Sequence, residues 1–97
     1  MKKDKQLTNS DLVARSNKDY IAQPMGEEII IMDVDAGKYI AINKMAAEIW
    51  AMLDKPVIVN DIVDTLLNRY EVSREQCERE TITCLMEMYA SKILTIG

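Results

Sequence analysis

The stretch EIIIMDVDAGKYIAI, residues 28–42, decides the fold of this chain. Its first part, Glu28 to Val34, is rich in β-branched residues and predicts a strand. Residues 35–38 follow, with Gly37 where a short hairpin loop favours a left-handed residue. Residues 39–42 (YIAI) supply a second apolar arm. The stretch therefore predicts a β-hairpin.

Three helices are predicted after the hairpin. Asn43 is a suitable N-cap for a helix over residues 44–53, whose apolar side chains recur at helical spacing. A second helix is expected over about residues 60–70, with its apolar side chains on one face. Ser73 opens a capping box that begins a third helix reaching about residue 91.

The ends of the chain give weaker signals. Residues 1–10 are polar and are expected to be a disordered tail, which leaves residues 11–97 as one domain. Short apolar pieces at 12–14 and 20–22 predict at least one edge strand, and residues 93–96 predict a last extended piece. The expected fold class is α+β: an N-terminal three-stranded antiparallel sheet followed by three helices, as in winged-helix domains.

Composition narrows the function. The 97 residues carry a formal charge of −4, which disfavours binding to duplex DNA because phosphate neutralisation supplies most of that affinity. The start of the chain lacks the apolar core of a signal peptide, and no apolar run approaches the roughly 20 residues of a membrane span. We therefore expect a soluble, cytoplasmic protein that contacts neither membrane nor nucleic acid.

The residues that catalysis or metal binding would use are scarce. There is no histidine, so neither a Cys–His nor a Ser–His pair can form, and the two cysteines fall short of a zinc site. Cys77 and Cys84 lie seven residues apart, about 10 Å along a helix, which is too far for a disulfide. Asp33 and Asp35 are interpreted as turn-forming residues. We expect no cofactor, no metal and no enzymatic activity.

The third helix has an unusually wide apolar arc. With Ile82 as the reference at about 100° per residue, Met86, Tyr89 and Ile93 fall within about 40° of it and predict an ordinary core stripe. A second group lies to one side, and the whole arc spans roughly 200°, twice what a surface helix needs. This extra group consists of Cys77, Thr81, Cys84, Leu85 and Met88.

The extra group permits two interpretations. It is either buried core, since Met and Cys fill cores well, or one wall of a groove. The second arm of the hairpin, Tyr39 to Ile42, leads directly into the first helix. If no strand pairs with its outer edge, its backbone groups stay open, and an extended peptide can add there as a strand. An open edge beside an apolar helix would form a slot for a peptide.

Two runs carry a resemblance to a known family. GKYIAINKMAAEIW, residues 37–50, contains a hairpin glycine, an aromatic residue, an apolar–Asn pair and a helix ending in Ile-Trp. VIVNDIVDTLLNRYEVSREQCERE, residues 57–80, contains a second helix, a Tyr-x-Val link and the start of a third. Together they resemble the PqqD-like leader-peptide recognition domains, over residues 11–97. Ile58 departs from the Thr or Ser common near the start of the second helix, which leaves Asn60 as the expected cap.

The resemblance implies a winged-helix-like fold that binds the leader of a ribosomally made peptide (a RiPP precursor). The leader would add to the third strand, residues 39–42, against the third helix. The chain is similar to stand-alone leader-binding subunits of lasso-peptide pathways, whose partners are a cysteine protease acting as leader peptidase and an ATP-dependent macrocyclase. The expected peptide-binding residues are Lys38, Tyr39, Ile40, Ala41, Ile42, Thr81, Cys84, Leu85, Met88 and Lys92.

Two other functions remain open at this level. A winged-helix DNA-binding regulator is compatible with the fold but not with the acidic charge. An obligate interface subunit of a larger enzyme would bury the extra apolar group in a protein–protein contact.

Overall fold

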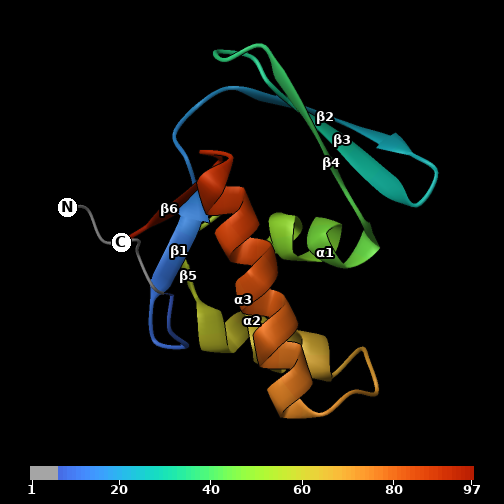
Figure 1. Cartoon of the computed structure of the whole chain (residues 1–97), viewed down its shortest axis with the longest axis vertical. Coiled ribbons are helices and arrows are strands. Elements are labelled where there is room, and N and C mark those ends of the chain that lie inside the picture. Colours follow the sequence, from blue (N-terminus) through green and yellow to red (C-terminus); the bar gives the residue numbers. More distant parts are fainter. Residues whose placement is uncertain (1–6) are drawn as a thin grey trace.

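The structure is a computed structural model that describes residues 7–97. These residues form two small antiparallel sheets and three helices (Figure 1). The elements in chain order are β1 (Leu12–Arg15), β2 (Tyr20–Met25), β3 (Glu28–Asp33), β4 (Lys38–Ile42), α1 (Lys44–Met52), β5 (Val57–Ile58), α2 (Val59–Leu67), α3 (Arg74–Ala90) and β6 (Leu94–Ile96). The expected α+β class is confirmed.

The sheet β2–β3–β4 is a meander built on the predicted hairpin. β3 and β4 pair from Ile29 opposite Ile42 to Asp33 opposite Lys38. Gly37 has φ +66° in the connecting loop, the left-handed conformation that the sequence predicted there. This is the expected three-stranded sheet, and its first strand is β2.

A second sheet, in the order β5–β1–β6, was not predicted as a sheet. β1 lies in its centre and pairs with β5 near the middle of the chain and with β6 at its end. The two edge strands are only two and three residues long, so neither shows a strand pattern of its own. The strands meet because the chain is folded back twice, which no local signal reveals.

The helix starts show which capping expectations hold. Asn43 accepts a hydrogen bond from the backbone N–H of Ala46 at 2.8 Å and begins α1 as predicted. α2 begins one residue earlier than expected, and its N-cap, Ile58, offers no side-chain hydrogen bond. The backbone N–H groups of the first two helical residues instead donate to the carbonyls of Asp11 and Asn9. The expectation that Asn60 caps this helix is therefore wrong: a neighbouring loop caps it.

α3 has a side-chain cap at one end and a backbone motif at the other. The Ser73 hydroxyl accepts from the Gln76 N–H at 3.1 Å, the predicted half of the capping box. The Gln76 side chain donates to Glu80 rather than back to the cap. At the end of α3, Lys92 takes φ +66°, and the N–H groups of Lys92 and Ile93 donate to the carbonyls of Tyr89 and Met88. This is a Schellman motif in which lysine stands where glycine is usual.

Part of the segment predicted as a disordered tail is ordered in the structure. Leu7 is buried in the core, and Thr8 and Asp11 are joined by two hydrogen bonds, one through the Asp11 carboxylate. Residues 7–10 are therefore packed on the domain. Residues 1–6 of the predicted tail lie outside the described part of the chain.

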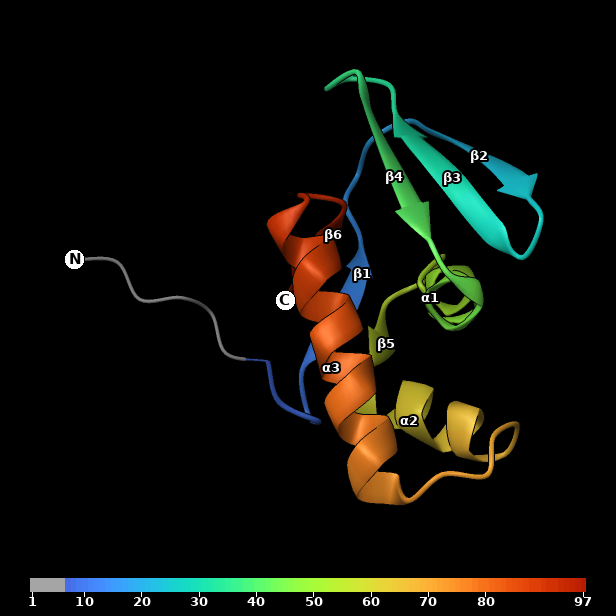
Figure 2. The ribbon, with the colours of Figure 1, turned by 45° about the vertical axis from the view of Figure 1, so that its right-hand side comes forward.

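One core joins the two sheets. Its fully buried side chains come from β1, β3 and all three helices, among them Val13, Ile31, Ile49, Ile62 and Leu85. α3 runs past the β5–β1–β6 sheet, and the end of β4 and the start of α1 lie beside it on another side (Figure 2). None of the helices within residues 7–97 is long and apolar enough to cross a bilayer.

Candidate functional site

Within residues 7–97, no further strand pairs with either edge of the sheet β2–β3–β4, so β2 and β4 are its two free edges. The N–H of Val34 donates to the carbonyl of Asp19, next to the facing pair Tyr20 and Asp33. That bond makes Tyr20–Asp33 a pair without mutual backbone hydrogen bonds, so Asp33 directs its backbone groups toward β4. By the strict alternation of antiparallel strands, Lys38, Ile40 and Ile42 bond to β3.

The backbone N–H and C=O groups of Tyr39 and Ala41 therefore point outward from the free edge of β4. The same alternation leaves Tyr20, Ala22 and Pro24 outward at the β2 edge. Pro24 has no N–H to offer, and proline is a common means of blocking an edge strand. Nothing comparable blocks β4, whose last four residues are uncharged. Of the two edges, β4 is the one equipped to accept another strand.

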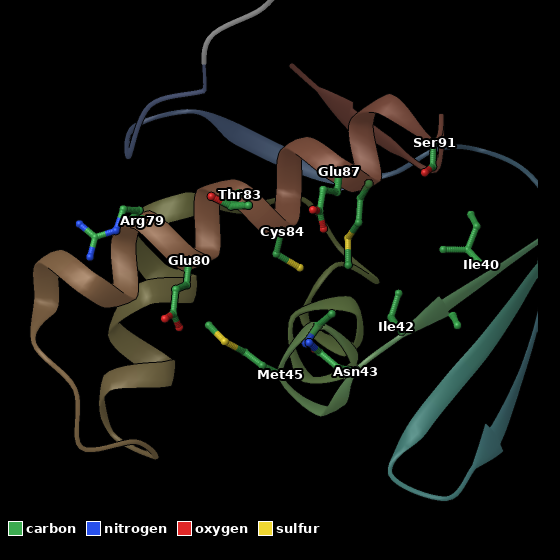
Figure 3. A pocket seen from close by; sticks show the side chains of 13 residues that line it. Ile40, Ile42, Asn43, Met45, Arg79, Glu80, Thr83, Cys84, Glu87 and Ser91 are labelled. Atoms are coloured by element: carbon green, nitrogen blue, oxygen red, sulfur yellow. The ribbon is translucent and has the colours of Figure 1, made fainter.

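A groove of about 670 Å³ lies along this edge, between β4, the start of α1 and α3 (Figure 3). Its floor is largely apolar, and its α3 side carries polar side chains at the lip. The groove is lined by Ile40, Ala41, Ile42, Asn43, Met45, Ala46, Arg79, Glu80, Thr83, Cys84, Glu87, Met88 and Ser91.

The rotation of α3 differs from the sequence-based prediction. The side of the helix that faces the core consists of Cys77, Thr81, Leu85 and Met88, all buried. Tyr89, expected in the core stripe, is 39% exposed, and Ile82 and Met86 are half-buried. The group interpreted as extra is thus mainly the core face. Of the predicted core stripe, Ile93 is buried as expected, whereas Ile82, Met86 and Tyr89 lie on the flank of the core face.

Burial of a threonine and a cysteine explains why periodicity misjudged this helix. The side chains of Cys77 and Thr81 lie 4.0 Å apart, sulfur to oxygen, and the Cys77 thiol also points at the carbonyl of Val63 at 3.9 Å. These contacts satisfy two weakly polar groups inside the core. A hydrophobicity pattern ranks Ile82 above both and therefore places the core stripe too far round the helix.

The predicted binding residues divide into three groups. Ile40, Ala41, Ile42, Cys84 and Met88 line the groove. Thr81 and Leu85 are completely buried and are not among the lining residues. Lys38, Tyr39 and Lys92 are exposed but do not line it, although the backbone of Tyr39 belongs to the free edge.

The sequence-based prediction missed two parts of the groove, the residues at the start of α1 and the polar residues of its α3 side. Asn43, Met45 and Ala46 come from the N-cap and first turn of α1, and Arg79, Glu80, Thr83, Glu87 and Ser91 come from α3 and its C-cap. Arg79, Thr83, Glu87 and Ser91 are spaced four residues apart, and Glu80 lies next to Arg79, so together they form one helix face next to the core face. A correct rotation of α3 would have revealed them.

The groove holds a thiol that is poorly suited to act as a nucleophile. Burial, and to a lesser extent the nearby Glu87 carboxylate, which disfavours a second negative charge, together raise the pKa of Cys84 to about 11. The thiolate is the reactive form, so little of it exists near neutral pH. Within residues 7–97, no three acidic or thiol side chains gather as a metal site would require.

The outer face of the same sheet is a second exposed apolar surface. The register aligns Ile21, Met32 and Tyr39 across the three strands on the face away from the core. Tyr39 is 70% exposed and Ile21 is 56% exposed. This outer face borders the free edge of β4, so a strand added to that edge would enlarge the outer face.

Residues 28–94, from β3 through the groove walls to β6, match the family model of coenzyme PQQ synthesis protein D (PqqD). The chain belongs to the PqqD family. The matched stretch contains both walls of the groove of this PqqD-family protein. The comparison with curated proteins gives no significant match.

A solved structure shares the fold of this PqqD-family chain. It is described as TbiB1 in complex with the TbiA(beta) leader peptide, and it superposes with a TM-score of 0.73. The match covers 84% of this chain and 93% of that chain at 21% sequence identity. The resemblance to the PqqD-like domains on which the sequence-based prediction rested is therefore confirmed.

Proposed function

We propose that this protein binds the leader of a RiPP precursor by strand addition to β4, against α3, and that it does so without catalysing a reaction. The observation that carries the proposal is the unblocked edge of β4 beside a groove of peptide dimensions. Main-chain bonds at such an edge give affinity, and side-chain pockets beside it give sequence preference. PqqD membership supports the proposal, as does a leader complex in a protein of the same fold.

The edge geometry determines how a leader would sit. Its backbone would pair with the outward groups of Tyr39 and Ala41. Residues of the leader that stand opposite Ile40 and Ile42 would point inward, toward Cys84 and Met88. Those beside them would point outward and join the outer face. The expected leader segment is therefore extended, with apolar side chains at every second position.

The partners are expected to be those of a lasso-peptide pathway: a cysteine-protease leader peptidase and, in addition, an ATP-dependent macrocyclase, all in the cytoplasm. A bound precursor would be delivered to them at raised effective concentration. The outer face, with Ile21, Met32 and Tyr39, is the surface we assign to the peptidase. It adjoins the bound leader, so a partner there would contact protein and peptide together.

The alternative of a DNA-binding regulator is weaker. Two of the three charged side chains at the lip of the groove on α3 are acidic, Glu80 and Glu87, and they would repel phosphate. The alternative of an obligate enzyme subunit predicts instead that the chain does not bind a free leader peptide.

Proline substitution tests the proposal at the free edge. Ala41→Pro removes an outward N–H without removing a bond to β3, and Ala22→Pro makes the matched change at the β2 edge. Fluorescence anisotropy is measured with labelled candidate leader peptides of RiPP precursors. We expect micromolar or tighter binding by the wild type and by Ala22→Pro, and at least tenfold weaker binding by Ala41→Pro.

Circular dichroism and thermal unfolding of each variant show that it is folded. Equal leader affinity of a folded Ala41→Pro variant and the wild type would rule out strand addition to β4. Met88→Asp is unsuitable for this purpose because Met88 is only 3% exposed, so a charge there would unfold the protein.

A further inference from the structure

Glu87 is the isolated charge of the groove. On the α3 side of the groove, Arg79 and Glu80 are neighbours in sequence and carry opposite charges. Glu87 lies two helical turns further along α3 and is exposed. Among residues 7–97 no basic side chain approaches its carboxylate within the 4 Å of an ion pair; the four ion pairs found all lie elsewhere.

The surroundings of Glu87 suit a long side chain with a charged tip. The apolar side chains of Ile40, Ile42 and Met88 line the groove beside it. Figure 3 shows Glu87 and Cys84 on the side of α3 that faces β4 and the start of α1. Lysine and arginine cover apolar surface with their aliphatic stems while keeping the charge at the tip near water or a counter-charge.

We propose that Glu87 makes the groove selective for a lysine or arginine in the bound peptide. The inference rests on the function proposed above. The cationic residue is inward-facing and stands two positions from the apolar residue held against Met88 and Cys84, because alternate residues of an added strand share a face. Its stem lies on Met88 and its cationic group meets the Glu87 carboxylate.

The expected size of the preference is modest but measurable. Exposed ion pairs contribute at most about 1 kcal/mol, so a cation is expected to bind up to about fivefold more tightly than a neutral residue of similar length. Lys38 and Lys92 are exposed and lie outside the lining of the groove, so they leave the preference in place. The interaction is screened by salt, so the preference should fall between 50 and 500 mM NaCl, as Debye lengths of about 14 and 4 Å imply.

A display experiment tests the inference without a known leader. A randomised twelve-residue peptide library displayed on mRNA is selected on the wild-type protein, on Glu87→Gln and on Glu87→Lys. Glu71→Gln and Glu71→Lys make the same charge changes at an exposed position outside the groove. Selection on Ala41→Pro gives the background that does not depend on the β4 edge.

The wild type and both Glu71 variants are expected to enrich Lys or Arg two positions from an apolar anchor. Glu87→Gln should lose this enrichment while keeping the anchor, and Glu87→Lys should enrich Asp or Glu at the same position. Enriched peptides with no cationic preference, or with one that survives Glu87→Gln, would overturn the inference alone. No enrichment over Ala41→Pro would overturn the proposed function.

Discussion

The guanidinium of Arg15 lies over the ring of Trp50, with its central carbon 4.2 Å from the ring centroid, and its Nη2 donates to the Trp50 carbonyl at 2.7 Å. Arg15 ends β1, and Trp50 lies in the last turn of α1, which has no basic residue of its own. A cation near the carbonyl end of a helix stabilises it. Trp50 also meets Tyr20 of β2 edge to face at 5.2 Å. The Arg15–Trp50 contact thus joins the β5–β1–β6 sheet to α1, the helix that follows β4.

Arg15→Met is expected to destabilise the fold by about 2 kcal/mol, because it removes a charged hydrogen bond and a cation–π contact. Urea unfolding followed by tryptophan fluorescence measures the change. Arg79→Met is the matched control, since Arg79 is exposed and forms no ion pair within residues 7–97. Equal stability of the two variants would show that the Trp50 contact contributes nothing.

The hairpin turn is expected to weaken in acid through Asp33. The buried Asp33 carboxylate accepts from the Lys18 ammonium at 2.9 Å and from the Ala36 N–H at 3.1 Å. The hydrogen bond from Lys18 lowers the pKa of Asp33, with the Ala36 N–H as the next cause. A lowered folded-state pKa stabilises the protein above the unfolded value of about 3.9, and this contribution is lost as pH falls through the folded-state pKa.

Free energies of unfolding measured between pH 7 and pH 2 check this expectation. The wild type should be more stable than Asp33→Asn at pH 7, and the difference should shrink below about pH 4. Asp35→Asn alters an exposed carboxylate in the same loop and serves as the control. A constant difference between wild type and Asp33→Asn over this range contradicts the assignment. The same bond raises the pKa of Lys18, so its contribution is lost in strong alkali, above about pH 10.4.

Cys84 is expected to react slowly with thiol reagents and to be protected by a bound peptide. With a pKa of about 11, only about one thousandth of the thiol is ionised at pH 8. The rate of reaction with a disulfide reagent should rise about tenfold per pH unit between pH 8 and pH 10. Cys84→Ser identifies the reacting group, since Cys77 is 1% exposed.

A saturating leader peptide should slow this labelling at least fivefold if it covers the groove. Protection that also occurs in Ala41→Pro would show that the peptide reaches Cys84 by another route than the β4 edge. Fast labelling at pH 8 in the free protein would contradict the raised pKa.

Lys92→Gly is expected to stabilise the protein by about 0.5–1 kcal/mol. The left-handed conformation of Lys92 costs a non-glycine residue about 1–2 kcal/mol, and the greater freedom of glycine in the unfolded chain cancels part of the gain. Thermal unfolding of the variant measures the effect, and Lys92→Ala, which keeps the strain, should not show it. Measured on the same two variants, leader affinity tests separately whether the Lys92 ammonium takes part in binding.

The sequence by itself determined the features that depend on neighbours in the chain. Gly37 specified the hairpin loop because it adopts the left-handed conformation freely, and Asn43 and Ser73 began helices because each caps an N–H three residues away. The two family runs, at residues 37–50 and 57–80, span these same local elements. The order of strands and helices along the chain followed from such short-range rules, whereas the open edge of β4 depended on which strands pair in the folded chain.

Only the tertiary structure decided which face of α3 is buried, and so which residues line the groove. Thr81 is core because Cys77 and its surroundings satisfy it, whereas Glu87 reaches the lip because the adjoining face was left uncovered. The β5–β1–β6 sheet likewise joins residues more than 40 positions apart. Such pairings depend on how the whole chain closes on itself, and short edge strands or a weakly polar core face carry no periodic signal that could reveal them.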